Sequence, residues 1–158
     1  MEELFRRHWA QTHRAALLIV RDGAAAEDIA QEAFVSALGA LGRFDRRRPF
    51  APWLHRIAVN RAIDWSRTRT LRREVAASRP AVDPATPGAE PQGLLDGELG
   101  VALAELAAEH RAVIVLRYLL EYTPGEISRL LELPRGTVNS RLRRALDRLS
   151  ELLGEEWR

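Results

Sequence analysis

With 158 residues, of which 46% are hydrophobic and 29% charged, the chain has the composition of a soluble globular protein with one ordinary domain or two small ones. It contains no cysteine, which excludes disulfide scaffolds, thiolate metal sites and cysteine nucleophiles. Its four histidines lack the spacing of a metal cluster, so no metal or other cofactor is expected. No apolar run approaches the roughly 18 residues of a membrane span, and residues 1–7 are charged rather than signal-like, which predicts a cytoplasmic protein without a membrane span.

The net charge of +2 is small, but the basic residues, all of them arginine, are unevenly distributed. Residues 1–75 hold 14 arginines and 9 acidic residues, residues 76–98 hold 1 and 4, and residues 99–158 hold 9 and 9. Ten arginines and two acidic residues lie between Arg43 and Arg73, and five arginines and one acidic residue lie between Arg135 and Arg148. Two separated basic patches suit a polyanion that is contacted at two points.

Three amphipathic helices are expected in residues 1–75, because apolar side chains recur there at helical spacing. The first covers about residues 2–21. The second runs through AAAEDIAQEAFVSALGAL and places Asp28, Gln31 and Glu32 opposite its apolar stripe. The third opens near Pro52, after a loop with an arginine triplet between two phenylalanines. The positions expected to pack inward are Leu4, Phe5, His8, Trp9, Leu17, Leu18, Val20, Ile29, Ala33, Phe34, Ala37, Leu38, Leu41, Trp53, Leu54, Ile57, Ala58 and Ile63.

The middle of the chain reads as a linker. Residues 77–93 (ASRPAVDPATPGAEPQG) hold four of the eight prolines and almost nothing large and apolar, which is typical of a flexible or extended segment. No part of the chain shows a sustained strand pattern. We therefore expect an all-α fold with two small helical domains, residues 1–75 and 99–158, joined by a flexible Pro-rich linker over residues 76–98.

The second domain is expected to contain a helix through Leu103 to Arg117, followed by a helix-turn-helix. Thr123, Pro124 and Glu126 match a capping box, with threonine as N-cap, proline at the first helical position and glutamate three residues after the cap. Pro134 disfavours helix at the residue before it, so a new helix should start near Arg135. Two helices joined by a short turn, the second one basic, are typical of DNA-binding proteins.

The last helix has two distinct faces. At about 100° per residue, Val138, Leu142, Ala145, Leu146 and Leu149 fall on an inward face. The opposite face carries Gly136, Thr137, Ser140, Arg143, Arg144 and Asp147, with Asn139 and Arg141 at its flanks. Small residues near the helix start allow close approach to a groove, and the arginines can reach phosphates or a guanine edge. The alternative is a solvated charged face; the cap, turn and basic helix in succession favour DNA binding.

The first domain has a different nucleic-acid pattern, in which basic and aromatic residues are interleaved. Rings and guanidinium planes can stack on unpaired bases, so this composition suits single-stranded or melted DNA. Packing in the core is the alternative for Trp53 and Trp65. The set is Phe44, Arg46, Arg47, Arg48, Phe50, Trp53, Arg56, Asn60, Arg61, Asp64 and Trp65.

Three segments in this order resemble a bacterial RNA polymerase sigma factor: AAAEDIAQEAFVSALGALGRF, PFAPWLHRIAVNRAIDW and, after the linker, LAELAAEHRAVIVLRYLLEYTPGEISRLLELPRGTVNSRLRRAL. The resemblance is to the compact extracytoplasmic-function (ECF) type, which has only the second and fourth conserved sigma regions, and it covers nearly the whole chain. It implies a transcription initiation factor, not an enzyme, that binds core RNA polymerase, reads the −10 and −35 promoter elements and assists DNA melting. It also implies an anti-sigma factor as a partner.

The resemblance implies a role for individual residues. The residues matching the part of the family that docks on the clamp helices of the largest polymerase subunit are Asp28, Gln31 and Glu32. The residues matching the reader of the melted −10 strand are Phe44, Arg46, Arg47, Arg48, Trp53, Arg56, Asn60, Arg61 and Asp64, and Trp53 is either packing or a wedge at the melted edge. Those matching the −35 reader are Arg135, Thr137, Asn139, Ser140, Arg141 and Arg144. Asn139 stands where many members carry Lys or Arg, and the arginine triplet 46–48 stands where mixed polar residues are common, so the base preferences stay open.

Three other classes of protein remain as alternatives. A stand-alone helix-turn-helix regulator would bind duplex DNA without polymerase, but leaves the first domain's basic side and the acidic face of its second helix unexplained. A pure interaction protein would sequester a partner with its amphipathic helices. An enzyme has little support, because the sequence contains no nucleophile elbow, phosphate-binding glycine loop or paired metal ligands.

Overall fold

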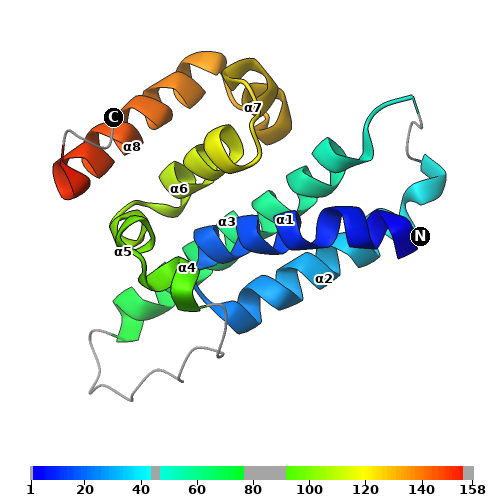
Figure 1. The fold of residues 1–158 in the computed structure, drawn as a ribbon, viewed down its shortest axis with the longest axis horizontal. Coiled ribbons are helices and arrows are strands. Elements are labelled where there is room, and N and C mark those ends of the chain that lie inside the picture. The colour runs from blue at the N-terminus through cyan, green and yellow to red at the C-terminus, as the bar shows by residue number, and fades with distance from the viewer. Residues whose placement is uncertain (1, 44–46, 77–91, 155–158) are drawn as a thin grey trace.

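The computed structural model describes residues 2–43, 47–76 and 92–154 and consists of helices packed in two groups (Figure 1). The first group contains α1 (Glu2–Val20), α2 (Gly23–Gly39), the 3-10 turn η1 (Leu41–Arg43) and α3 (Phe50–Ala76). The second contains α4 (Gln92–Asp96), α5 (Glu98–Ala104), α6 (Ala108–Ile114), the π-helical turn η2 (Val115–Leu119), α7 (Pro124–Leu131) and α8 (Arg135–Leu153). No strand occurs in these ranges, so the all-α prediction is confirmed.

Helices α1, α2 and α3 form a bundle that matches the expected pattern closely. Asp22 caps α2, because its carboxylate accepts a hydrogen bond of 3.0 Å from the backbone N–H of Ala25. Most of the positions expected to pack inward are buried or half-buried, which confirms the periodicity. Two of them differ: Leu38 is 37% exposed and Phe5 is 45% exposed, although the Phe5 ring stacks on Trp9 at 4.9 Å.

The prediction of one helix from Leu103 to Arg117 is wrong, because the helix is broken between α5 and α6. The break leaves Leu106 buried, and the guanidinium of Arg111 donates a hydrogen bond to the Leu106 carbonyl. That side chain satisfies a carbonyl that a continuous helix would have paired with a backbone N–H. The segment contains no glycine or proline, so its sequence carries no local sign of the break.

The helix-turn-helix forms as predicted. Thr123 Oγ1 accepts a hydrogen bond of 3.2 Å from the Glu126 N–H, and Glu126 Oε1 accepts one of 3.0 Å from the Thr123 N–H, which completes the capping box. Glu132 ends α7 in the left-handed conformation with φ of 55°, and α8 begins at Arg135. The turn therefore occupies residues 132–134.

The two groups of helices share one hydrophobic core. Ile19 and Val59 of the first group belong to the same buried cluster as Val113, Leu116 and Tyr122 of the second. In Figure 1, α6 lies between the first bundle and α8. The second group therefore packs on the first through α6, η2 and α7, which leaves α8 on the outside.

Candidate nucleic-acid and protein interfaces

The outer face of α8 carries the six residues predicted to read duplex DNA. Val138, Leu142, Ala145 and Leu149 are buried, which turns the opposite side of the helix outward. Three of the six are exposed and three are half-buried; the exposed ones are Arg135, Asn139 and Arg144, and the half-buried ones are Thr137, Ser140 and Arg141. The inward face is thus confirmed except that Leu146 is only half-buried, while DNA contact by the outer face stays a prediction.

The arginines of α8 also create a positive field at α6. Burial is the main cause of the lowered pKa of His110, and the charge of Arg141 lowers it further, against an opposing effect of Glu109. His110 is therefore neutral at pH 7 and adds no charge to this end of the domain. The positive charge there comes from the arginines, which can contact phosphates.

One side of α3 gathers four of the residues predicted to read melted DNA. Trp53, Arg56, Asn60 and Asp64 follow one another at intervals of three and four residues, so they form one stripe along the helix. Asn60, Asp64 and Arg56 are exposed, whereas Trp53 is half-buried and meets Phe50 edge to face at 5.8 Å. Arg47 and Arg48 are exposed in the preceding loop, and Phe44 and Arg46 lie outside the described residues.

Arg61 departs from this stripe and faces α2. Its guanidinium contacts Glu32 Oε2 at 2.8 Å and donates a hydrogen bond of 2.6 Å to Ser36 Oγ. A residue predicted to touch DNA is therefore paired with a residue predicted to touch polymerase. DNA contact by Arg61 would require it to leave that carboxylate.

A hollow of about 880 Å³ lies where the loop before α3 meets α7. The predicted residues Arg48, Trp53 and Arg56 line one side, and Tyr122 and Glu126 line the other. Two further arginines, Arg43 and Arg129, line it and were not among the predicted site residues. Arg43 lies three residues before the arginine triplet, a signal that the sequence did offer, but Arg129 reaches the hollow only through the packing of the two groups of helices.

The exposed face of α2 carries Asp28, Gln31 and Glu32, as the periodicity predicted. Val35 lies on the same side of α2, three residues after Glu32 and four after Gln31, and is 69% exposed. Carboxylates repel phosphate groups, so this face suits a protein partner better than a nucleic acid. Helical spacing could have revealed Val35, because it continues the polar stripe by one turn.

Residues 2–43, 47–76 and 92–154 contain no group of three or more histidine and carboxylate side chains placed to hold a metal ion. None of the helices described is long and apolar enough to cross a membrane.

Comparisons with known proteins point in one direction. The family model for Sigma-70 region 2 matches residues 4–72, and the model for Sigma-70, region 4 matches residues 96–149. The chain is similar to the ECF RNA polymerase sigma factor SigM of Mycobacterium tuberculosis, with 36% identity over 97% of this chain and 76% of the relative. It is 35% identical to the RNA polymerase sigma factor CarQ of Myxococcus xanthus, over 98% and 89%.

Solved structures are similar over both groups of helices. CnrH, in complex with the cytosolic domain of CnrY, is 30% identical and matches with a TM-score of 0.69 over 96% of this chain and 86% of that one. The sigma factor RpoE of Bartonella quintana, in complex with the anti-sigma factor NepR, has the same fold, with a TM-score of 0.74, 24% identity and coverage of 98% and 96%.

Proposed function

Because this chain belongs to the ECF group of RNA polymerase sigma factors, we propose that α2 binds core polymerase, α3 reads the −10 element and α8 reads the −35 element. The chain is a transcription initiation factor that binds core RNA polymerase and directs it to specific promoters. The observation that supports the division of labour best is that one chain presents three chemically different faces: acidic with valine on α2, basic and aromatic on α3, and basic on α8.

At the −35 element, α8 would enter the major groove. Arg135 and Arg144 are exposed and can contact phosphates or a guanine edge, while Thr137 and Ser140 are small enough for a close approach. Asn139 is exposed on the same face, and its amide is suited to an adenine edge.

At the −10 element, the stripe on α3 would hold bases extruded from the opened duplex. Trp53 offers an aromatic edge at the end of the stripe, Asn60 and Asp64 can read base edges, and Arg56 can contact phosphate. Unstacking costs a few kcal/mol per base, so capture at an easily melted sequence adds selectivity. The function is positional and involves no bond chemistry.

The two DNA contacts are individually modest, and polymerase would make them act together. Residues 1–75 and 99–158 form the two proposed regions, and residues 76–98 the linker between them. Two sites joined by a linker and fixed on one partner gain through effective concentration. The same proposal places the protein in the cytoplasm, where it would bind the clamp helices of the polymerase. We also propose that an anti-sigma protein holds it inactive. The related RpoE structure, which contains the anti-sigma factor NepR, supports such a partner.

Run-off transcription with bacterial core polymerase tests the assignment. The chain should direct promoter-specific transcripts, whereas tight duplex binding by the chain alone without any effect on polymerase would favour a stand-alone regulator.

Arg144→Ala should reduce −35-dependent transcription while polymerase affinity is unchanged. Arg148→Ala is the matched control, because Arg148 is also on α8 but pairs with Glu151 at 3.1 Å.

The α2 face is tested separately with Asp28→Ala and Gln31→Ala in one variant. This pair leaves the Arg61–Glu32 contact in place, so α3 is not disturbed. We expect weaker binding to core polymerase and unchanged binding of a −35 duplex. Equal loss of polymerase binding in this variant and in Arg144→Ala would contradict the division of labour.

A further inference from the structure

We propose that the hollow lined by η1, α3 and α7 binds a small anionic ligand of the nucleoside polyphosphate class. The phosphates of the ligand would contact the arginines that line the hollow, and the base would pack on its aromatic and apolar residues. Such binding requires neither polymerase nor DNA, so it goes beyond the function proposed above.

The hollow is large enough for a ligand, and its lining is positively charged. Its volume of about 880 Å³ falls within the range of roughly 300–1,000 Å³ that is usual for small-molecule sites. The charged residues that line it are all exposed, and they are Arg43, Arg48, Arg56, Arg129 and Glu126. Four positive charges against one negative charge leave a formal charge of +3. Two of these groups are already engaged, because Arg56 pairs with Glu132 and Glu126 Oε1 accepts the Thr123 N–H at 3.0 Å in the capping box. A concave surface with this charge favours a multiply charged anion.

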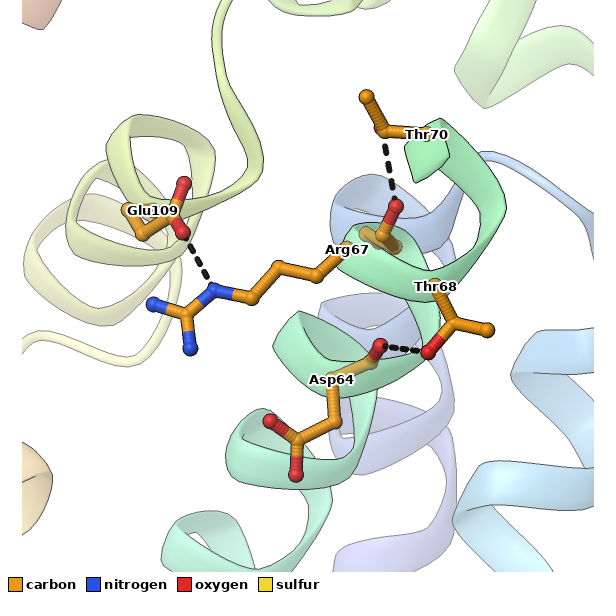
Figure 2. A network of polar contacts seen from close by, with 6 residues as sticks. Asp64, Arg67, Thr68, Thr70 and Glu109 are labelled. Carbon is orange, nitrogen blue, oxygen red and sulfur yellow. Dashed lines mark hydrogen bonds and ion pairs between the residues drawn. The ribbon is translucent and has the colours of Figure 1, made fainter. Parts of the chain in front are cut away.

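The arginines of the protein differ in whether a carboxylate of the same chain already holds them. Figure 2 shows Arg67 of α3 reaching across to Glu109 of α6, with Nε 2.6 Å from Oε1. Among the residues that the structure describes, neither Arg43 nor Arg129 forms such an ion pair. Their planar guanidinium groups can therefore donate to phosphate oxygens without displacing a carboxylate.

The less exposed part of the lining is apolar and aromatic. Pro52 and Trp53 are half-buried, and Tyr122 and Leu130 are buried. The Tyr122 hydroxyl is engaged 2.6 Å from His55 Nδ1, so its ring offers the hollow an apolar surface. A flat base can pack on such residues, whereas inorganic phosphate or an aliphatic polyanion would leave them unused. Ring surface and guanidinium groups together therefore select a nucleoside polyphosphate.

An occupied hollow would compete with melted DNA. Trp53 and Arg56 line the hollow and also belong to the stripe of α3 that we propose reads the −10 element. A free nucleotide and an unpaired base of the strand have the same chemistry, so each would exclude the other from Trp53. Arg43 and Arg129 distinguish the two ligands, because they line the hollow and neither is among the residues proposed to read DNA.

Direct binding is measured by isothermal titration calorimetry on the full chain, at about 0.15 M salt and without Mg²⁺. ATP and GTP are the nucleotide probes, tripolyphosphate carries the charge without the ring, and adenosine carries the ring without the charge. We expect the nucleotides to bind about tenfold more tightly than either part alone. Tripolyphosphate binding as tight as that of ATP would overturn the nucleoside class, and no binding by either nucleotide would overturn the site. Neither result depends on run-off transcription, so the two proposals fail separately.

The residues are tested with Arg43→Gln and Arg129→Gln combined. Both side chains are exposed, so the fold should be retained, and an unchanged melting temperature checks this. Loss of two charged hydrogen-bond donors should weaken ATP binding by about tenfold. The matched control combines Arg72→Gln and Arg143→Gln, which removes the same charge from exposed positions of α3 and α8 outside the hollow. An equal loss in the control would attribute binding to net charge and overturn the proposal.

Competition with DNA has its own readout, the affinity for a random single-stranded oligonucleotide of about 20 nucleotides. This readout rests on the proposed −10 stripe, whereas calorimetry does not. Saturating ATP should weaken strand binding to the wild type several-fold, and the same ATP concentration should have a smaller effect on the Arg43→Gln, Arg129→Gln variant. An equal reduction in both proteins would show that ATP acts only as a salt, which contradicts competition at the hollow.

Discussion

Acidification should destabilise the protein through His55, the buried histidine of α3. Burial, with a smaller contribution from the charge of His8 on α1, lowers the pKa of His55 from 6.5 to about 4. Its neighbour Tyr122 stays protonated, because burial and Glu126 raise the pKa of that hydroxyl to about 12. The folded state therefore holds the imidazole neutral, whereas the unfolded chain protonates it near pH 6.5. The stability that depends on the neutral imidazole is complete above pH 6.5 and is lost as the pH falls toward 4.

These two pKa values set the size of the effect. Between pH 7.5 and pH 5, linkage predicts that the free energy of unfolding falls by about 2 kcal/mol through this one group. Urea unfolding followed by the fluorescence of the four tryptophans gives the free energy at each pH. The informative quantity is the free energy of unfolding of the wild type minus that of His55→Gln. Both proteins contain the carboxylates that begin to titrate near pH 5, so their contribution cancels in this difference.

A second variant separates the pH dependence from the hydrogen bond. Tyr122→Phe removes the hydroxyl 2.6 Å from Nδ1 but keeps the imidazole buried. We expect it to lower stability by about 1 kcal/mol at every pH while it preserves the slope. A flat difference between wild type and His55→Gln from pH 7.5 to 5 would refute the reasoning, since a buried neutral histidine must produce this slope.

Two further predictions concern the second group of helices. Gly100→Ala should destabilise the protein by about 1–3 kcal/mol, because a Cβ at Gly100 would clash with the carbonyl oxygen of Leu94. Gly39→Ala is the control: nothing lies within 4 Å, so its melting temperature should rise slightly. Thr123→Ala should cost about 1 kcal/mol in urea unfolding, because it removes the N-cap of α7; an unchanged midpoint would show that the capping box contributes little.

Local signals explain why the helix-turn-helix was predictable. The capping residues Thr123 and Glu126 are three positions apart, and Pro134 acts on its immediate neighbour, so the sequence contains the whole cause of the α7–α8 boundary. The faces of α2 and α8 were predictable for a similar reason, because burial on one side follows helical spacing.

Contacts between distant residues explain what was not predictable. His55 and Tyr122 are 67 positions apart, and nothing near either residue indicates the other. The break before α6 depends on the reach of Arg111, and the sequence predicts that Arg61 joins the stripe for DNA, although its guanidinium turns to Glu32.

The pairing of Arg61 with Glu32 has a consequence for genetics. Substitutions at Glu32 would alter the face of α2 that we propose binds polymerase. They would also release the Arg61 guanidinium beside the stripe that we propose reads the −10 element, so one substitution would change two traits. A screen for loss of polymerase binding would yield substitutions at Glu32. Starting from such a substitution, second-site suppressors at Arg61 would restore promoter selection and leave the polymerase defect intact. Such allele-specific suppression would separate two phenotypes that a single substitution confounds.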